Sequence, residues 1–576
     1  MPATMVHQKR AYVWFPLLTI AVVVTVGCEP NERRSGPPST NVPFFVEVTG
    51  RLGLADPPDS WPDGHYLTPE LTGGGVAVWD YDGDGDLDIY QVCHPAPAPF
   101  PTAFEKSAPN RLFEQQDDGT FVDVTAIAGL GDSGYGHGVA VGDVDNDGHL
   151  DVYITNYGTD AMYLNNGDGT FRNVTHSAGV ATEGWSSSAA FLDYDGDGDL
   201  DLYVARFARF DPHRQCSNPS GTEPDYCGPQ IFEGVTDVLY RNAGNGVFTN
   251  VSKSAGVNAP SRGWGVVCAD LTGDGLIDIY VANDSEPNIL WTNLGDGKFR
   301  DEAARRGIAV NGMGRAEAGM GVAAGDIDGD GRLELFVTHL QGETNTLYLA
   351  DEKQGFRDDS AGSGVGAPSM IRTGWGCGFL DLDHDGDLDL ALVNGRVTRG
   401  EVVPESLDTP FWSRYAEPNQ VFENMDRQKL RFEHASQRAS GFSQHVENTR
   451  GLALGDIDGD GDIDLVTNNL DNTLRVFRND APTDSEHWVI VRPMTGKRDA
   501  YGAVVTVTTD QSKQTRVAHP TVGYLSSSHP TAHFGLGIAK AIQSIDILWP
   551  DQTRERFAAD GVDRQIVVQK GSGRSP

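Results

Sequence analysis

Short apolar runs separated by glycine-rich and acidic turns fill most of this chain. The run at residues 87–92, Leu-Asp-Ile-Tyr-Gln-Val, is typical, because it is short, rich in branched and aromatic side chains, and preceded by an acidic turn. Such runs predict β-strands. Seven runs that combine glycine with apolar residues are predicted to be inner strands, where glycine permits close approach of neighbouring backbones. They lie at residues 74–78, 136–140, 184–185, 263–267, 319–322, 374–376 and 451–454.

A second hairpin is predicted after each inner pair of strands. Residues 164–171, 241–248 and 292–299 place Asp-Gly or Asn-Gly turns between apolar runs, which is a strong hairpin signal. Each repeat therefore supplies about four short strands. A phenylalanine-led segment also recurs seven times, and seven loops with seven such segments imply seven blades: Phe45, Phe121, Phe171, Phe248, Phe299, Phe356 and Phe432.

The first of these segments lies before the first repeat. We therefore expect the strand at Phe45 to complete the last repeat, which would close a ring and remove exposed strand edges.

An acidic loop of the form D-x-D-x-D-G-x-x-D joins the first two strands of every repeat. The seven copies start at Asp80, Asp143, Asp193, Asp270, Asp326, Asp381 and Asp456, at intervals of 50 to 77 residues. A period near fifty with insertions predicts one propeller blade per repeat. The expected fold class is all-β, a seven-bladed β-propeller with a small C-terminal β domain.

The spacing of the acidic side chains predicts calcium sites. Carboxylates at positions 1, 3, 5 and 9 surround a turn that glycine at position 6 permits, and a hard cation requires six to eight oxygen ligands. Position 7 contributes its backbone carbonyl, so its side chain varies. An EF-hand is excluded because position 12 holds Gln91, Ile154 or Val204 and the loop leads into a strand. The predicted ligands are Asp80, Asp82, Asp84, Asp86 and Asp88; Asp143, Asp145, Asp147, His149 and Asp151; Asp193, Asp195, Asp197, Asp199 and Asp201; Asp270, Thr272, Asp274, Leu276 and Asp278; Asp326, Asp328, Asp330, Arg332 and Glu334; Asp381, Asp383, Asp385, Asp387 and Asp389; and Asp456, Asp458, Asp460, Asp462 and Asp464.

Two loops depart from the pattern. Thr272 replaces a carboxylate at position 3 of the fourth loop, and Glu334 replaces aspartate at position 9 of the fifth. Loss of ligand charge lowers affinity, so the fourth site is expected to be the weakest of up to seven calcium sites.

These repeated loops and hairpins resemble the FG-GAP (VCBS-type) repeat proteins, which include integrin alpha-subunit propellers and the cartilage acidic protein group. The resemblance covers residues 44–480. It implies a seven-bladed propeller with its calcium loops on one face.

A separate β domain is predicted at residues 486–567, followed by a tail at residues 568–576. Alternating runs at residues 488–491, 503–508 and 545–549 predict strands. The segments 498–503, 523–528 and 533–537 resemble the ASPIC/UnbV domain, a family whose role is poorly defined. Its polar cluster, Tyr524, Ser526, Ser528, His529 and His533, is interpreted either as a pocket or as turn residues and strand caps.

The N-terminus predicts export. Lys9 and Arg10 precede an apolar run at residues 11–27 and then Cys28, so residues 1–28 match a signal sequence and residues 29–43 a flexible linker. Residues 25–28 resemble a bacterial lipoprotein box with lipidation at Cys28. The alternative is an uncleaved signal anchor. Either arrangement places the body in the periplasm or at the cell surface, attached to a membrane.

Cysteines and charge refine this picture. Cys216 and Cys227 share one insertion and are expected to form a disulfide in an oxidising compartment, whereas Cys93, Cys268 and Cys377 are expected to be buried thiols. The formal net charge of −38 disfavours a nucleic-acid partner, because phosphate binding requires clustered Lys and Arg. The long insertions at residues 205–235 and 395–420 are the expected partner surfaces.

The sequence predicts a calcium-binding scaffold for adhesion to an extracellular glycan or protein, and no catalytic residue is assigned. Nucleophile-elbow, phosphate-loop, H-E-x-x-H and C-x-x-C motifs are absent from the sequence. A calcium-dependent polysaccharide lyase or hydrolase of the cell envelope is the enzymatic alternative. An accessory role in envelope assembly or secondary metabolism is the other.

Overall fold

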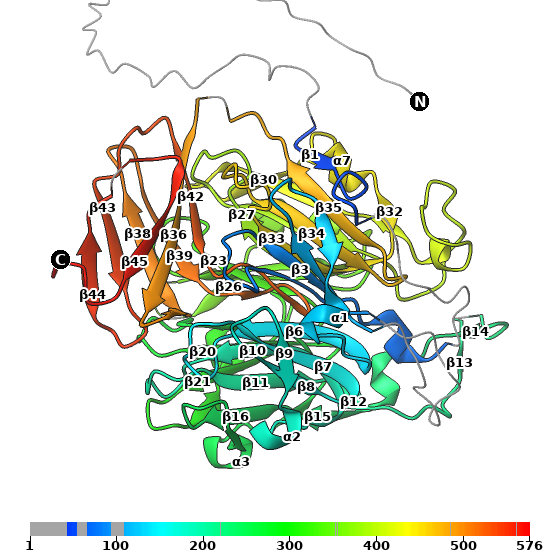
Figure 1. The fold of residues 1–576 in the computed structure, drawn as a ribbon. Helices are drawn as coiled ribbons and strands as arrows, with labels where there is room; N and C mark the ends of the chain where they lie inside the picture. Colours follow the sequence, from blue (N-terminus) through cyan, green and yellow to red (C-terminus); the bar gives the residue numbers. More distant parts are fainter. Residues whose placement is uncertain are drawn as a thin grey trace, which may run out of the picture. The chain divides into compact units, whose positions relative to one another are not determined.

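Mainly antiparallel strands of two to ten residues are the principal regular elements in the computed structural model of this protein (Figure 1). The structure describes residues 43–54, 66–93 and 109–576, except residues 219, 352, 354, 484 and 560. The predicted signal sequence with Cys28, and nearly all of the predicted linker, lie outside the described residues. In the part that is described, no helix has the length and apolar character needed to cross a membrane.

Seven four-stranded antiparallel units repeat along the described residues. In chain order they are β2 (Val76–Trp79), β3 (Asp88–Gln91), β4 (Arg111–Gln115) and β5 (Phe121–Asp123); β6 (Tyr135–Gly142), β7 (Asp151–Thr159), β8 (Ala161–Asn165) and β9 (Phe171–Asn173); β10 (Glu183–Leu192), β11 (Asp201–Arg206), β16 (Val238–Asn242) and β17 (Phe248–Asn250); β19 (Gly263–Ala269), β20 (Asp278–Asn283), β21 (Ile289–Asn293) and β22 (Phe299–Asp301); β23 (Val322–Gly325), β24 (Glu334–Val337), β25 (Thr346–Ala350) and β26 (Phe356–Asp358); β27 (Gly374–Leu380), β28 (Asp389–Asn394), β30 (Gln420–Asp426) and β31 (Arg431–His434); and β33 (Thr449–Gly455), β34 (Asp464–Asn469), β35 (Leu474–Asn479) and β1 (Phe45–Glu47).

The chain closes on itself through its first described strand. β1 pairs with β35 in the register Phe45 to Asn479, so the N-terminal strand completes the last unit as the sequence predicted. The first strands of successive units contact one another in chain order, and β33 contacts β2. The prediction of an all-β fold is confirmed. The number of seven blades stays a prediction, to which the seven units of the described residues correspond.

Glycine allows the first strands to pack this closely. A Cβ atom added to Gly321 would overlap the Trp375 carbonyl of the next unit, and one added to Gly75 would overlap the Leu525 carbonyl. The predicted close approach at the inner strands therefore depends on residues without a side chain. Between the units, apolar side chains from neighbouring sheets form separate cores, such as the one that joins Val141, Val152 and Tyr163 to Trp79.

One-turn helices follow the fourth strands of several units. They are α1 (Thr125–Ala128), α2 (Thr175–Ala178), α3 (Ser252–Ala255), α4 (Ala303–Arg306), α5 (Ser360–Ser363), α6 (Gly366–Ser369) and α7 (Ser440–Ser443), and the 3₁₀ turns are η1 (Thr68–Leu71), η2 (Pro229–Ile231) and η3 (Trp412–Arg414). The insertions carry two-residue and four-residue strands: β12 (Ala208–Arg209), β13 (Cys216–Ser217), β14 (Pro224–Asp225), β15 (Glu233–Thr236), β18 (Pro260–Ser261), β29 (Glu417–Pro418) and β32 (Val446–Glu447).

The C-terminal module, residues 487–569, contains two small sheets, drawn in orange to red in Figure 1. Their facing sides form one core that includes Val491, Val505, Phe534 and Trp549. The strands are β36 (His487–Thr495), β37 (Arg498–Asp499), β38 (Ala503–Thr508), β39 (Lys513–Ala518), β40 (Thr521–Val522), β41 (Ser526–Ser527), β42 (Ala532–Gly537), β43 (Ser544–Leu548), β44 (Arg554–Phe557) and β45 (Arg564–Gln569). Of these, β40 and β41 leave the module and join the sheet of β2.

Candidate metal centres

The aspartate at position 1 of each acidic loop folds the loop around itself. In the first loop, Asp80 Oδ1 accepts a hydrogen bond from the Gly83 N–H (2.7 Å), and Oδ2 accepts one from the Gly85 N–H (3.2 Å). Backbone N–H groups of the same loop bind the position-1 carboxylate in the other six loops as well, as with Gly148 and Asp143 at 2.9 Å. These bonds hold the following carboxylates on the inner side of the turn.

Positive φ angles occur at two positions of every loop. Position 6 is glycine throughout, with φ between 89° and 104°, which agrees with the sharp turn predicted there. Position 4 is also left-handed in all seven loops, which the sequence reasoning missed. Five of these residues are glycine, but the second and sixth loops place Asn146 (φ 60°) and His384 (φ 58°) in this conformation. Asn tolerates that region better than most residues.

The carboxylate at position 9 fastens the loop to the sheet. Asp88 Oδ2 accepts a hydrogen bond from the Tyr81 N–H, and Oδ1 accepts one from the Gln115 N–H of β4, both at 2.9 Å. Equivalent pairs of backbone bonds occur at Asp151 and at Asp464. Position 9 is therefore a structural clamp, and each of its oxygens keeps a second lone pair for a cation.

The structure brings the predicted carboxylates into tight groups. Ligand atoms of each group lie within 4.8 Å of one another in at least five loops: Asp80, Asp82 and Asp88; Asp143, Asp145 and Asp151; Asp193, Asp195 and Asp197; Asp326, Asp328 and Glu334; and Asp381, Asp383 and Asp385. Burial raises the pKa of Asp88 and of Asp201 to about 8, and that of Glu334 to about 9, with the neighbouring carboxylates adding to the shift. Such groups repel one another until a proton or a cation neutralises them.

Buried oxygen atoms without donors also point to a cation. Asp145 Oδ1, Asp381 Oδ1 and Asp456 Oδ1 are buried and have no hydrogen-bond partner. A buried acceptor without a partner is costly, and a charged one more so. An all-oxygen donor set of this kind fits a hard divalent cation such as calcium.

In at least two loops the side chain at position 7 pairs with another side chain. Asp199 Oδ1 accepts a hydrogen bond from Asn146 of the preceding loop at 2.7 Å, and Arg332 pairs with Asp330. This arrangement is compatible with the prediction that position 7 offers its backbone carbonyl.

The C-terminal module covers the acidic loops with donor groups. The glycine carbonyl at position 6 accepts a hydrogen bond from Arg498 at Gly198, from Gln552 at Gly275 and from Arg516 at Gly386 (3.2 Å), and it lies 3.0 Å from His533 Nε2 at Gly461. Lys497 Nζ reaches the Asp147 carbonyl of the second loop at 3.0 Å. The sequence reasoning missed this docking. Its signal was the group of basic residues in a module that follows an acidic repeat array.

A segment of this module fills the centre of the ring of first strands. We call residues 521–528, which include β40 and β41, the tongue. Its Leu525 carbonyl accepts the Val139 N–H of the second unit at 3.0 Å, and Gly523 exchanges backbone hydrogen bonds with Val322 of the fifth unit at 2.8 and 3.0 Å. Tyr524 packs against Trp264 and Trp375, with ring centroids 5.8 and 5.0 Å apart.

The polar cluster predicted in this module therefore divides into two parts. Tyr524 and Ser526 are buried in the tongue, where the Val76 N–H approaches Ser526 Oγ at 3.4 Å. Ser528, His529 and His533 line a cavity of about 140 Å³ between the module and the fifth, sixth and seventh units. Both interpretations made from the sequence thus describe part of the cluster.

The two predicted partner surfaces contact each other. Cys216 and Cys227 form a disulfide, with their Cα atoms 5.1 Å apart, inside the first insertion. Arg399 of the second insertion forms an ion pair with Glu223 of the first at 2.7 Å, and Tyr415 donates a hydrogen bond to Asp225 at 3.2 Å. Cys93, Cys268 and Cys377 are buried thiols.

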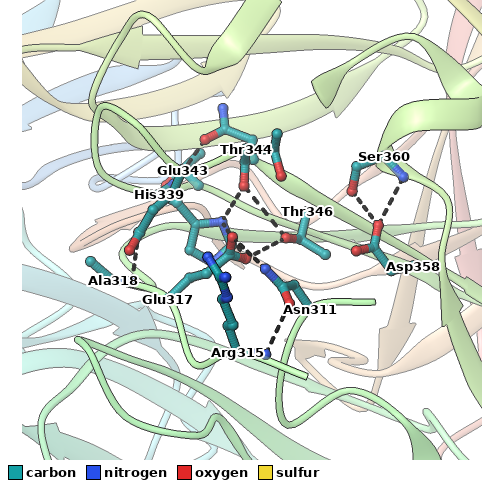
Figure 2. A network of polar contacts seen from close by, with 12 residues as sticks. Asn311, Arg315, Glu317, Ala318, His339, Glu343, Thr344, Thr346, Asp358 and Ser360 are labelled. Carbon is teal, nitrogen blue, oxygen red and sulfur yellow. Dashed lines mark hydrogen bonds and ion pairs between the residues drawn. The ribbon is translucent and has the colours of Figure 1, made fainter. Parts of the chain in front are cut away.

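A buried polar network in the fifth unit brings titratable groups together away from the acidic loops (Figure 2). Glu317 accepts hydrogen bonds from Asn311 Nδ2 (2.8 Å) and Thr346 Oγ1 (3.0 Å), and the His339 Nδ1–H donates to the Thr344 carbonyl (3.0 Å). Glu343 accepts the Ala318 N–H at 2.9 Å. These polar groups are paired with one another, so the network braces the loops of this unit.

Comparison with known proteins gives two family matches. A model described as FG-GAP-like repeat matches residues 102–154, 143–204, 232–281, 270–337 and 326–392, and a model described as ASPIC and UnbV matches residues 494–575. Human cartilage acidic protein 1 is 28% identical over 310 residues, which cover 52% of this chain and 43% of that protein. The chain therefore spans less than half of the length of this curated relative.

Solved structures give weaker similarities. An Agrocybe aegerita lectin described as recognising non-reducing terminal N-acetylglucosamine has a TM-score of 0.38 at 17% identity, covering 66% of this chain and 85% of the lectin. A rhamnogalacturonan lyase has a TM-score of 0.36 at 16% identity, covering 76% of each chain.

Proposed function

This chain is built from FG-GAP-like repeats followed by an ASPIC/UnbV domain, and on that premise we propose that it is an exported, membrane-tethered calcium-binding scaffold for a glycan or protein partner. Calcium would stabilise the acidic loops, and the rigid array of sheets would present other loops to the partner. No catalytic step is assigned to this scaffold.

The acidic loops carry the calcium part of the proposal. The buried, unpartnered oxygens of Asp145, Asp381 and Asp456 support it most directly, because the polypeptide provides no donor for them. The residues that would hold the ions are the carboxylates at positions 1, 3, 5 and 9 and the carbonyl at position 7. Bound calcium would neutralise the carboxylates and fix the loops that the C-terminal module contacts.

The expected position of the partner follows from the surfaces that the C-terminal module already contacts. The module contacts five of the seven acidic loops, and its tongue occupies the centre of the ring, so this end of the strands is already partly covered. The partner is therefore expected at the opposite ends of the strands, where the insertions at residues 205–235 and 395–420 emerge.

Export and tethering are proposed from the sequence. A lipid on Cys28, or an uncleaved anchor at residues 11–27, would hold the body at a membrane in the periplasm or at the cell surface. The disulfide between Cys216 and Cys227 supports an oxidising compartment. Calcium is plentiful outside the cytosol, which suits sites of this type.

Thermal unfolding of the chain from residue 35 onward tests the calcium part. Ions that bind only the native state raise its stability by mass action, by about 2.7 kcal/mol per site at 100 times the dissociation constant. We expect a large rise in melting temperature with calcium that a chelator reverses. Asp145→Asn should reduce this rise, whereas Asp296→Asn, which removes the same charge from an exposed turn, should leave it unchanged. An equal melting temperature with calcium and with chelator would refute the calcium assignment.

A further inference from the structure

A surface pocket lies in the third unit, at the ends of the strands away from the acidic loops. It is lined by side chains that include Tyr157, Trp185, Arg206 and Phe210, and its volume is about 530 Å³. Pockets of roughly 300–1,000 Å³ are typical of small-molecule sites. Tyr157 is near the end of β7 and Arg206 ends β11, whereas the acidic loops precede the starts of both strands.

Three aromatic rings form one wall of this pocket. Tyr157 and Phe210 lie edge-on to each other with ring centroids 5.6 Å apart, and each lies edge-on to Trp185 at 6.0 and 5.5 Å. Trp185 is fully buried, but Tyr157 and Phe210 are only partly buried. A rigid aromatic surface that stays partly open to solvent suits a flat ligand with an apolar face.

A positioned guanidinium forms the polar part of the pocket. Arg206 Nη2 donates to the Glu183 carbonyl and Nη1 to the Thr236 carbonyl, at 2.6 and 3.4 Å, while its buried Nε has no hydrogen-bond partner. Gly184 lets the guanidinium lie against the backbone, because a Cβ atom there would be 2.8 Å from Nη2.

Asp237 and Asp160, the carboxylates on which the charge of Arg206 acts, are hydrogen-bonded to other groups. Asp237 accepts hydrogen bonds from Tyr203 Oη (2.6 Å) and from the Arg206 backbone N–H (2.8 Å), and Asp160 accepts them from Tyr153 and Ser186. Among the described residues, no carboxylate forms an ion pair with the Arg206 side chain within 4.0 Å. The guanidinium therefore retains capacity for an external anion.

We infer that this pocket binds a carboxylated sugar, a uronic acid residue of an acidic glycan. The apolar face of the sugar ring would pack on Tyr157 and Phe210, and the sugar carboxylate would accept hydrogen bonds from Arg206. A planar carboxylate matches the planar guanidinium, which favours arginine over lysine at such a site. At the rim, Arg209 and Glu233 pair at 3.6 Å with both side chains largely exposed, so they contribute little to affinity. This inference rests on the proposed function, since it names the ligand class and the site of the same scaffold.

Titration calorimetry in saturating calcium tests the inference on the chain from residue 35 onward, which keeps every described residue. The probes are trigalacturonic acid and its methyl ester, which retains the sugar rings but removes the charges. We expect the acid to bind at least about tenfold more tightly than the ester, as one charge-assisted hydrogen bond predicts.

Variants then locate the binding. Arg206→Gln and Phe210→Ala should each weaken trigalacturonate binding about tenfold or more, whereas Arg209→Gln at the rim should change it less than about twofold. Arg206→Lys keeps the charge and should restore only part of the affinity. Melting temperatures in calcium check that the variants fold. If Arg206→Gln does not fold, the affinity of Phe210→Ala tests the inference.

Four results would overturn the inference. The acid and the ester could bind equally, the trisaccharide could fail to bind, or binding could survive Arg206→Gln but disappear on Asp145→Asn, which would place the sugar on calcium. Binding of an acidic peptide that is lost in Arg206→Gln, when trigalacturonate does not bind, would likewise assign the pocket to a protein partner. Each of these results leaves the calcium test of the scaffold unaffected, so the two proposals fail separately.

Discussion

The Tyr524 hydroxyl donates a hydrogen bond to the Thr72 carbonyl at 2.7 Å, across 452 residues of chain. Both residues are buried, and the bond joins the tip of the tongue to the segment that leads into the first inner strand. The ring of first strands and the C-terminal module are thus connected at the centre as well as over the acidic loops.

Shortening Tyr524 should destabilise the whole body. Tyr524→Phe removes one buried hydrogen bond and leaves the Thr72 carbonyl without its donor, a loss of about 1–3 kcal/mol. Tyr524→Ala also leaves a cavity beside Trp264 and Trp375 and should cost about 3–5 kcal/mol, as for other large aromatic deletions. Urea unfolding in saturating calcium measures both. If Tyr524→Ala were as stable as the parent chain, the tongue would not support the ring.

Two glycines of the seventh loop separate backbone strain from docking of the module. Gly459 and Gly461 have φ angles of 73° and 96°, so alanine is strained at both. A Cβ atom at Gly459 meets nothing within 4 Å, whereas one at Gly461 would overlap the Trp488 indole of the module. Gly461→Ala should therefore cost about 1–3 kcal/mol more than Gly459→Ala.

Hydrogen exchange should place that extra cost in the module. Amides of β36 should exchange faster in Gly461→Ala than in Gly459→Ala, with calcium present in both. Equal exchange in the two variants would mean that Trp488 moves aside and that this contact does not hold the module.

The sequence predicted most of the elements that recur in each repeat but few of the contacts between distant parts of the chain. The acidic spacing, the inner glycines and the phenylalanine-led strands recur with a fixed local order, so the FG-GAP and ASPIC/UnbV resemblances and the all-β fold were accessible and are confirmed. Local order also sufficed to pair β1 with β35.

The tongue was not accessible in this way. Its contacts, such as that of Leu525 with Val139, join positions hundreds of residues apart and have no periodic signature. The clamp at position 9 was also missed, because an aspartate that binds two backbone N–H groups has the same sequence signal as a calcium ligand. The left-handed conformation of His384 was also missed. Its side chain lies 3.0 Å from Asp462 of the neighbouring loop, and the local sequence does not reveal this contact.

His339 should make the protein sensitive to acid (Figure 2). Burial lowers the pKa of His339 from 6.5 to about 4, and it also raises the pKa of Glu317, whose carboxylate lies 3.8 Å from His339 Nδ1. The folded-state pKa lies below the unfolded value, so this contribution is present above about pH 6.5 and is lost as the pH falls toward 4. Its upper limit is roughly 3 kcal/mol.

His339→Asn isolates that contribution. Asparagine can still donate to the Thr344 carbonyl but does not titrate, so the variant should lose less stability than the parent chain between pH 6.5 and 4. Denaturant midpoints in saturating calcium at several pH values measure the difference. Parallel pH profiles for the two proteins would show that His339 titrates normally.

Adding a carboxylate at position 3 of the fourth loop should make the protein less stable than the parent chain without calcium and more stable than it with calcium. Thr272 is buried at position 3 of the loop that also carries Asp270, Asp274 and Asp278. In Thr272→Asp a fourth like charge should lower the melting temperature in chelator, whereas in calcium it supplies a ligand and should raise the melting temperature above that of the parent chain. Thr292→Asp is the matched control, because Thr292 is equally buried but lies in strand β21 outside the loop. That variant buries a carboxylate with no cation to neutralise it and should be less stable in both conditions.

A calcium titration of Thr272→Asp should also show its weakest site tightened about tenfold, as expected when ligand charge increases. If calcium failed to rescue Thr272→Asp any better than Thr292→Asp, the fourth loop would not be a cation site.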